Sequence, residues 1–359
     1  MSNPVLIIAE GLDRSKTRII IGLHSEGVAL EVMMKPEHPR FAELEAAGVS
    51  VTGIRLKGRL DGASVRQIRA RVKKVVRLIH CLRNNRPLAN ALLATVGMKV
   101  PIVAYRGTMG NLGWWDPGSR TTYLHKRASR LIAVSEGVRR YLTAELGLPE
   151  EKVVTIYKGH EPEWYEQTTL PDPATFNIQP DEFVLGCVAN MRPLKGIDTL
   201  IRALEHLPPR PIVHLLLVGK VQDELIHRLA AENQTPHRIN LVGFRDDAPA
   251  VVGLADVGVL VSKRREGLAR SVIETMSQGK PMIVSDVGGL PELVEDGVSG
   301  IVVPPDNPVA LAMAIQSFAG HPDAVVSQGA AARKRIETHF HVSQSIAKTK
   351  ALYDDVAGE

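Results

Sequence analysis

The segment from Glu266 to Glu274 constrains the fold more than any other part of the sequence. An apolar run at 257–261 precedes it and is typical of a buried strand in a parallel sheet. The residues after it have the spacing of the buried face of a helix, with apolar side chains at Val272, Ile273 and Met276. The sequence therefore predicts a strand, a short glycine loop and the start of a helix.

This loop and helix start have the chemistry of a phosphate site. The first backbone N–H groups of a helix lack partners and carry partial positive charge, so they attract anions. Gly267 lets the backbone approach a ligand, and we expect Leu268 and Ala269 to lie beside the phosphates. Glu274, about one turn into the helix, is placed for ribose hydroxyls, and Glu266 for sugar hydroxyls. The alternative is an ordinary strand–helix connection with two solvated glutamates.

The rest of the second half continues the same alternation. Residues 279–303 read as turn, strand, glycine loop, helix, turn and strand, and a further strand is expected at 183–190. Arg192 and Lys195 follow that strand and precede Gly196 and a predicted helix start. Two cations at this position suit a diphosphate, although they are also compatible with a solvated pair.

The chain has 359 residues, which suggests two domains. It is 44% hydrophobic and 23% charged, as expected of a soluble globular protein. Two cysteines without CxxC spacing predict neither a disulfide framework nor a zinc site, and they fit a reducing cytosol. The first residues lack a basic region and run directly into a strand, so we expect a cytoplasmic protein without a signal peptide.

The motifs at 191–196, 266–274 and 279–303 together resemble the carboxyl-terminal half of the family 4 glycosyltransferases. The resemblance is dense over 184–303, weaker over 129–159 and thin before that. It implies an α/β protein of GT-B fold, with two doubly wound Rossmann-like domains facing each other across a cleft. The implied domains are an acceptor-side domain at 1–170, a nucleotide-sugar domain at 171–340, and a last helix at 341–359 that crosses back.

The resemblance also implies the function and the roles of residues. It implies a retaining hexosyltransferase that uses a UDP- or GDP-sugar, with Arg192 and Lys195 on the donor β-phosphate and Glu266 as the third catalytic residue. Gly219 and Phe244 belong to the expected donor site, in which the loop near Phe244 holds the nucleobase. The expected acceptor is a lipid-linked glycan, a lipopolysaccharide or a polysaccharide.

The first half departs from the family pattern at several positions. Relatives often have two glycines after the first strand, where this chain has only Gly11 near the donor phosphates and the acceptor. Many relatives have a histidine near Arg106, which can hold a phosphate or carboxylate instead. His80 lies two residues before another expected histidine, so His80, Arg83 and Arg106 are alternative replacements. A histidine in an apolar run is also compatible with a structural role.

Charge is unevenly distributed along the chain. Residues 1–170 contain 26 Lys and Arg against 16 Asp and Glu, and the remainder contains 18 against 23, giving net charges of +10 and −5. A basic amphipathic helix expected at 64–78 can lie peripherally on an anionic membrane at the inner face of the plasma membrane, or can simply be a solvated helix. Nucleic-acid binding has only the basic first half in its favour and is not expected.

The sequence also bears on whether the protein needs a metal ion and on whether it is an active enzyme. The chain has no DxD pair, so we expect no metal and no cofactor, because two cations and a helix dipole can stabilise the leaving diphosphate. A catalytically inactive GT-B protein that binds a nucleotide sugar or glycan is the main alternative. A sugar-nucleotide epimerase or a phosphorylase fits the motifs less well.

Overall fold

The computed structural model describes residues 3–74, 76–82, 85–165 and 169–358. The chain forms two compact units, one of residues 1–159 with 342–359 and one of residues 160–341. The expected boundary after residue 170 is therefore too late. The short helix η3 (Pro162–Tyr165) packs on α10 and α13 of the second unit, and His160 pairs with His341.

The first unit is built on a seven-stranded parallel sheet in the order β3-β2-β1-β4-β5-β6-β7. Its strands are β1 (Val5–Ala9), β2 (Leu30–Met34), β3 (Ser50–Gly53), β4 (Leu78–Leu82), β5 (Ile102–Arg106), β6 (Arg130–Ala133) and β7 (Val153–Thr155). Its helices are α1 (Arg14–Ser25), α2 (Arg40–Ala46), α3 (Gly62–Val72), α4 (Asn85–Ala94), α5 (Pro117–Arg120), α6 (Glu136–Arg140) and α14 (Val342–Ala357).

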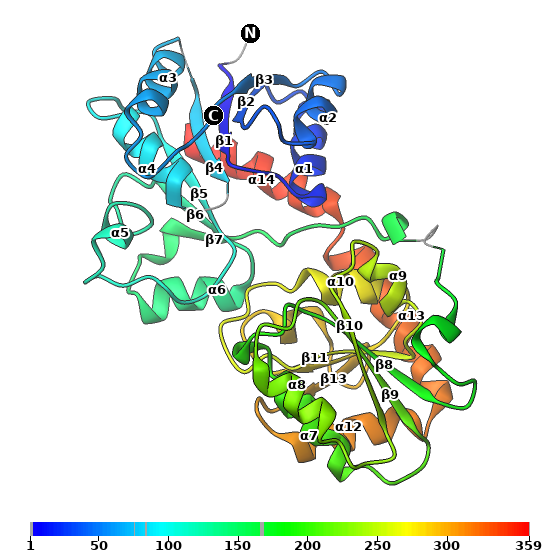
Figure 1. The fold of residues 1–359 in the computed structure, drawn as a ribbon. Coiled ribbons are helices and arrows are strands. Elements are labelled where there is room, and N and C mark those ends of the chain that lie inside the picture. Colours follow the sequence, from blue (N-terminus) through cyan, green and yellow to red (C-terminus); the bar gives the residue numbers. More distant parts are fainter. Residues whose placement is uncertain (1–2, 75, 83–84, 166–168, 359) are drawn as a thin grey trace. The chain divides into compact units, whose positions relative to one another are not determined.

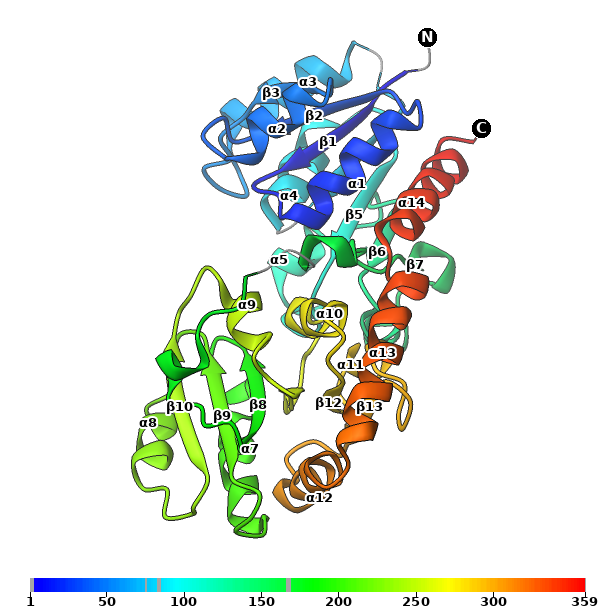
Figure 2. The same cartoon turned by 90° about the vertical axis from the view of Figure 1, so that its right-hand side faces the viewer.

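The central strands of this sheet, β1 and β4, are buried along their whole length, as apolar parallel strands require. The last helix, α14, packs beside α1 (Figures 1 and 2). Gly22 allows this approach, because a Cβ there would lie 2.2 Å from Ile346 Cδ1. The expected carboxyl-terminal helix thus belongs to the first unit.

The second unit is built on a six-stranded parallel sheet in the order β10-β9-β8-β11-β12-β13. Its strands are β8 (Phe183–Val188), β9 (Val213–Val218), β10 (Arg238–Gly243), β11 (Val257–Leu260), β12 (Met282–Ser285) and β13 (Gly300–Val303). Its helices are α7 (Ile197–Ala203), α8 (Glu224–Ala231), α9 (Ala248–Val252), α10 (Arg270–Ser277), α11 (Leu290–Leu293), α12 (Pro308–Ala319) and α13 (Pro322–His339). Both units are Rossmann-like, as predicted.

The prediction of a basic helix at 64–78 is wrong at the carboxyl end, because the observed helix, α3, ends at Val72. Val76 and Arg77 lie in the approach to β4, where Arg77 pairs with Asp354 at 2.5 Å, and Val75 lies outside the described residues. No single helix among those described is long and apolar enough to cross a membrane; α12 and α13 meet the length and composition test only as a pair bent by 101°.

Candidate functional site

A cavity of about 290 Å³ opens at the carboxyl ends of four neighbouring strands of the second unit, β10, β9, β8 and β11. Ligands of doubly wound sheets gather at such an edge. Its lining includes most of the second-half residues that the sequence singled out, namely Lys195, Gly219, Phe244, Glu266, Leu268, Ala269 and Glu274. Gly267 is buried between two of them.

Lys195 and Glu266 form the most closely connected pair in this cavity. The Lys195 ammonium lies 2.5 Å from Glu266 Oε2, and both side chains are more than four-fifths buried, with 17% and 14% exposed. Ser262, two residues after the end of β11, donates a hydrogen bond from its hydroxyl to the same carboxylate oxygen at 2.8 Å. The hydroxyl and the ammonium therefore fix the orientation of Glu266. An ammonium has three N–H donors, so Lys195 can also contact an anion.

Glu274 lies on the buried side of α10, one turn after Arg270. Arg270 Nε lies 3.2 Å from Glu274 Oε1, and the Tyr165 hydroxyl lies 3.5 Å from the same oxygen. Sequence reasoning missed Tyr165 because it assigned that segment to the first domain. Nothing in the sequence around Tyr165 indicates this contact. It follows from the packing of η3 against α10 in the structure.

Two glycines let the strand-end loops close around the cavity. Gly196 has φ +66°, and a Cβ there would lie 2.0 Å from the carbonyl oxygen of Val261. Gly219 has φ +137°, and a Cβ there would lie 2.0 Å from the carbonyl oxygen of Ala189. A side chain is excluded at both positions by sterics and by backbone conformation. Gly219 thus shapes the cavity that it lines.

The amino end of α10 faces the cavity through Ala269, Arg270 and Ser271. Ala269 occupies the N-cap position, and its methyl group cannot accept the hydrogen bonds that Ser or Asp would. The first N–H groups of α10 therefore have no side-chain cap and remain available for an anionic ligand. The predicted role of the 267–269 segment is compatible with this arrangement.

A flat apolar surface borders the other side of the cavity. Phe244 follows β10 with 61% of its area exposed, and the Lys220 ammonium lies 5.4 Å from its ring centroid. Arg245, a lining residue that the sequence did not suggest, is fixed by Asp247 through two contacts of 2.7 Å. An exposed aromatic ring beside fixed polar groups suits a planar heterocycle.

The structure does not bring every predicted residue to this cavity. Arg192 is exposed, and the described lining residues do not include it. Gly11 and Arg106 belong to the first unit. The guanidinium of Arg106 donates to the carbonyl of Thr108 at 2.8 Å and to that of Gly110, so this buried arginine orders its own loop. Arg83 lies outside the described residues.

No group of three or more His, Cys, Asp or Glu side chains is placed to hold a metal ion within the described ranges. Lys263, next to the cavity loop, instead forms ion pairs of 2.8 Å with both Asp198 and Asp306. Burial works against the charge of Lys263, but the hydrogen bonds that its ammonium donates to these two carboxylates outweigh burial and raise the pKa of Lys263. These ion pairs hold the loop that carries Glu266 against the start of α7.

Comparisons with known proteins agree with this fold. The family model described as Glycosyltransferase Family 4 matches residues 10–164, and the one described as Glycosyl transferases group 1 matches residues 182–321. A D-inositol 3-phosphate glycosyltransferase from Streptomyces bingchenggensis is 26% identical over 77% of this chain and 61% of its own length. The lipopolysaccharide core biosynthesis mannosyltransferase LpcC of Rhizobium leguminosarum is 23% identical over 67% of this chain and 68% of its own length.

Among solved structures, Anabaena HepE in complex with UDP has a TM-score of 0.79 at 20% identity, covering 98% of this chain and all of that one (100%). The chain spans 50–61% of the length of several curated relatives that it matches. The two family models lie on the two units in turn, and the fold is that of GT-B glycosyltransferases. The chain belongs to the family 4 glycosyltransferases.

Proposed function

We propose that this protein is a retaining hexosyltransferase that moves a sugar from a nucleotide diphosphate sugar to an acceptor hydroxyl without a metal ion. The observation that carries the proposal is the Lys195–Glu266 pair beside the uncapped amino end of α10 in one cavity. A cation and a helix dipole offset the charge that builds on the β-phosphate as the sugar bond breaks. Retention rests on the family resemblance.

The positions of the lining residues suggest which part of the donor each of them contacts. Lys195 can give one N–H to Glu266 and another to the diphosphate, while the first N–H groups of α10 contact the same phosphates. Glu274 supplies carboxylate oxygens for the ribose hydroxyls. Phe244 offers a face on which the nucleobase can stack. Arg192 completes the clamp if its exposed side chain turns to the bound diphosphate.

Two comparisons support the substrate class. The Anabaena protein of similar fold was crystallised with UDP, and a Rhizobium relative is named a lipopolysaccharide core mannosyltransferase. We therefore propose a UDP- or GDP-sugar as donor. We propose a lipid-linked, lipopolysaccharide or polysaccharide glycan as acceptor, and a cytoplasmic location with contact to the inner face of the membrane.

A thermal-shift screen of the full chain against UDP, GDP, ADP and their sugars tests the donor site. A ligand at 100 times its Kd should raise the free energy of unfolding by about 2.7 kcal/mol, so a true donor shifts the melting temperature by a few degrees. Hydrolysis or transfer of the sugar from the stabilising donor then separates an enzyme from an inactive binding protein. Stabilisation without any product, even with glycan acceptors present, would favour the binding protein.

A further inference from the structure

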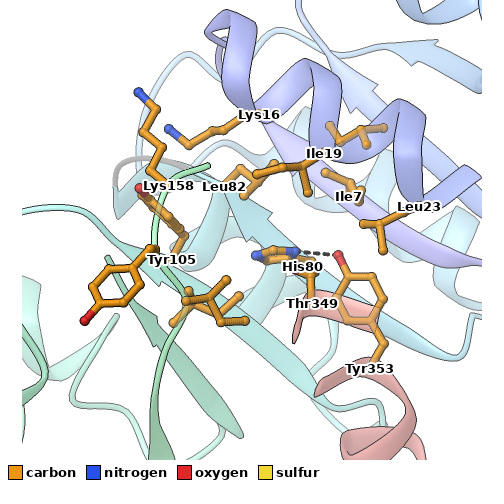
Figure 3. A pocket seen from close by; sticks show the side chains of 14 residues that line it. Ile7, Lys16, Ile19, Leu23, His80, Leu82, Tyr105, Lys158, Thr349 and Tyr353 are labelled. Carbon is orange, nitrogen blue, oxygen red and sulfur yellow. Dashed lines mark hydrogen bonds between the residues drawn. The ribbon is translucent and has the colours of Figure 1, made fainter. Parts of the chain in front are cut away.

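His80, one of the alternatives for the histidine that relatives have, belongs to the interior of the first unit. Its Nδ1 lies 2.7 Å from the hydroxyl of Tyr353 on α14, and apolar side chains such as Ile7, Leu23 and Leu82 line the small cavity beside this pair (Figure 3). His80 thus connects β4 to α14. The residues of this unit that can meet a macromolecular partner are those on its surface.

The positive charge of the first unit comes from one stretch of the chain. Residues 62–115 contain ten Lys and Arg and no Asp or Glu, so this stretch alone accounts for the net charge of +10 that residues 1–170 carry. Exposed apolar groups lie in the same part of the chain and are typical of a surface that binds a partner. Among the described residues of the first unit, the large apolar side chains that are exposed come from this stretch or directly before it, namely Leu60, Leu93, Val96, Trp114 and Trp115.

Leu93 and Val96 lie at the end of α4, beside the end of α3. Leu93 is 40% exposed and Val96 is 57% exposed. The two helices pack against each other (Figure 1). Arg69 of α3 donates hydrogen bonds to the carbonyl of Ala94 at 2.8 Å and to that of Val96 at 3.0 Å. The two apolar side chains are therefore held in place beside a basic helix.

Exposed lysines accompany these apolar side chains. Lys73 follows Arg69 by one helical turn and therefore lies on the same side of α3, Lys74 is next to it, and Lys99 comes three residues after Val96. All three lysines are exposed. A Cβ added at Gly97 would meet no atom within 4 Å, so the turn after α4 has open space around it. We call the five side chains of Leu93, Val96, Lys73, Lys74 and Lys99 the α4 tip.

The backbone at the α4 tip is unusually well hydrogen-bonded, because the last carbonyls of a helix ordinarily lack partners. The six carbonyls of residues 91–96 all accept hydrogen bonds, four of them from the guanidinium groups of Arg69 and Arg127. The bonds from Arg127 to the carbonyls of Leu92 and Thr95 are 2.7 Å long. This end of the helix can therefore enter an apolar environment without leaving a carbonyl unpaired.

We propose that the α4 tip docks the first unit on an anionic lipid bilayer. Leu93 and Val96 enter the interface between the head groups, and the three lysines contact the anionic groups of the lipids. The inference rests on the membrane contact of the proposed function and names the surface that makes it.

The chemistry of the α4 tip favours a bilayer over a nucleic acid, which would carry the same negative charge. Single-stranded nucleic acids are held by aromatic rings on which bases stack, and Leu93 and Val96 offer no ring. The acyl chains below a lipid head group accept aliphatic side chains. Trp115 is 99% exposed, but it follows β5 at the carboxyl edge of the sheet, whereas the turn after α4 leads to the amino end of β5. Trp115 is therefore not part of the tip.

The first test measures insertion directly in the full chain. Val96→Cys carries a polarity-sensitive fluorophore, and the two native cysteines are buried, so the label is specific. Val326→Cys is the matched control, because Val326 is 73% exposed on α13 of the second unit. We expect vesicles of phosphatidylcholine and phosphatidylglycerol to shift the emission of labelled Val96→Cys to shorter wavelength and to leave labelled Val326→Cys unchanged.

Sedimentation with the same vesicles separates insertion from charge. The double variant Leu93→Gln with Val96→Gln keeps every charge and should bind about tenfold more weakly or worse, because the apolar area that enters the interface is lost. Lys73→Gln, Lys74→Gln and Lys99→Gln should each weaken binding by about fivefold. Val326→Gln is the control and should bind as the wild type does.

Neither test contains a nucleotide sugar or an acceptor, so a failure here leaves the donor site untouched, and a failed donor screen leaves this surface untouched. Equal vesicle affinity of the wild type and the double variant would overturn the proposal and leave binding by charge alone. A wild type that does not bind anionic vesicles would overturn it as well. An emission shift caused by an oligonucleotide and not by vesicles would indicate a nucleic-acid surface instead. A shift that appears without vesicles as the protein concentration rises would indicate contact between copies of the chain, again against the proposal.

Discussion

The ammonium of Lys195 and the carboxylate of Glu266 are 2.5 Å apart, although 71 residues separate them in the chain. Each comes from the loop after a different strand, β8 for Lys195 and β11 for Glu266, and these strands are neighbours in the sheet. The pair thus joins the two motifs that the sequence marked most clearly. In the mechanism that we propose, Glu266 offsets the charge of Lys195 before the donor binds, and a bound diphosphate would share that ammonium.

Lys195→Ala should lower turnover by about tenfold to a thousandfold, because a strong contact to the charge of the transition state is lost. Arg192→Ala should also lower turnover, but less, since its side chain is exposed and does not line the cavity. Steady-state kinetics with the donor found in the screen measures both effects. Lys334→Ala, an exposed lysine on α13, is the control. Unchanged turnover in Lys195→Ala would remove Lys195 from the mechanism.

The two glutamates should have different roles. Glu274→Gln should weaken binding of the free diphosphate, because an amide replaces a charge-assisted acceptor worth about 1.5–3 kcal/mol. Glu266→Gln should leave diphosphate affinity nearly intact and reduce turnover instead. Calorimetry with the diphosphate, combined with steady-state kinetics, separates the two effects. An equal loss of diphosphate affinity in both variants would show that this division of roles is mistaken.

Much of this arrangement follows from local patterns. The strand–glycine–helix signal around Glu266 and the cations before Gly196 are short motifs whose geometry is set within about ten residues of chain. Parallel strands also bring their carboxyl ends to one edge, so residues at the ends of β8, β9, β10 and β11 had to meet. For these reasons most of the residues that line this cavity could be predicted from the sequence.

Contacts between distant segments were not predictable in the same way. Tyr165 reaches Glu274 only because η3 docks on α10, and His80 meets Tyr353 only because α14 packs beside α1. The end of α3 at Val72 was missed because the following apolar residues fit a helical stripe as well as an approach to β4. The spacing of apolar residues alone cannot distinguish a longer helix from a connection to β4. The pairing of β4 in the sheet determines which of the two forms.

Activity should survive a chelator. If Lys195 and the start of α10 offset the charge on the diphosphate, EDTA should leave turnover within about twofold of its starting value, since no metal is part of the transition-state stabilisation. The measurement is a time course of sugar transfer with and without EDTA. Added magnesium or manganese should not raise the rate. Complete loss of activity that either metal restores would contradict the metal-free mechanism.

Membrane contact should depend on the exposed cations on α3 and directly after it. Arg69 is committed to the carbonyls of Ala94 and Val96, whereas Arg66, Lys73 and Lys74 are exposed. We expect the wild type to sediment with anionic vesicles, and each of these three cations changed to Gln to weaken binding by about 1 kcal/mol. Added salt should weaken it too. Zwitterionic vesicles are the control. If the wild-type protein does not sediment with anionic vesicles, the proposed membrane contact is contradicted.

Asp13 allows a test of the first unit that needs no ligand. Its carboxylate accepts a hydrogen bond from the N–H of Lys16 and contacts the ammonium groups of Lys16 and Lys158. Burial by itself would raise the pKa of Asp13, but the charges of Lys158 and Lys16 outweigh burial and hold this pKa well below its ordinary value. Ionised Asp13 therefore stabilises the fold above its unfolded pKa, and this stabilisation is lost as the pH falls toward the folded pKa.

Asp13→Asn removes the charge but keeps the cap, because Asn caps helices about as well as Asp. At pH 7 the free energy of unfolding of the first unit should fall by about 3–5 kcal/mol, as when one partner of a buried ion pair is removed. Urea unfolding at several pH values measures the difference in free energy of unfolding between this variant and the wild type. This difference should become smaller once the pH drops below about 4, where aspartate in the unfolded chain takes up protons. Asp116→Asn, at the cap of α5, should cost much less, because Asp116 and the nearby Arg59 are both exposed. The difference in free energy of unfolding between the wild type and Asp13→Asn could instead stay constant from pH 7 to pH 3. The ionised carboxylate would then not be what stabilises this unit.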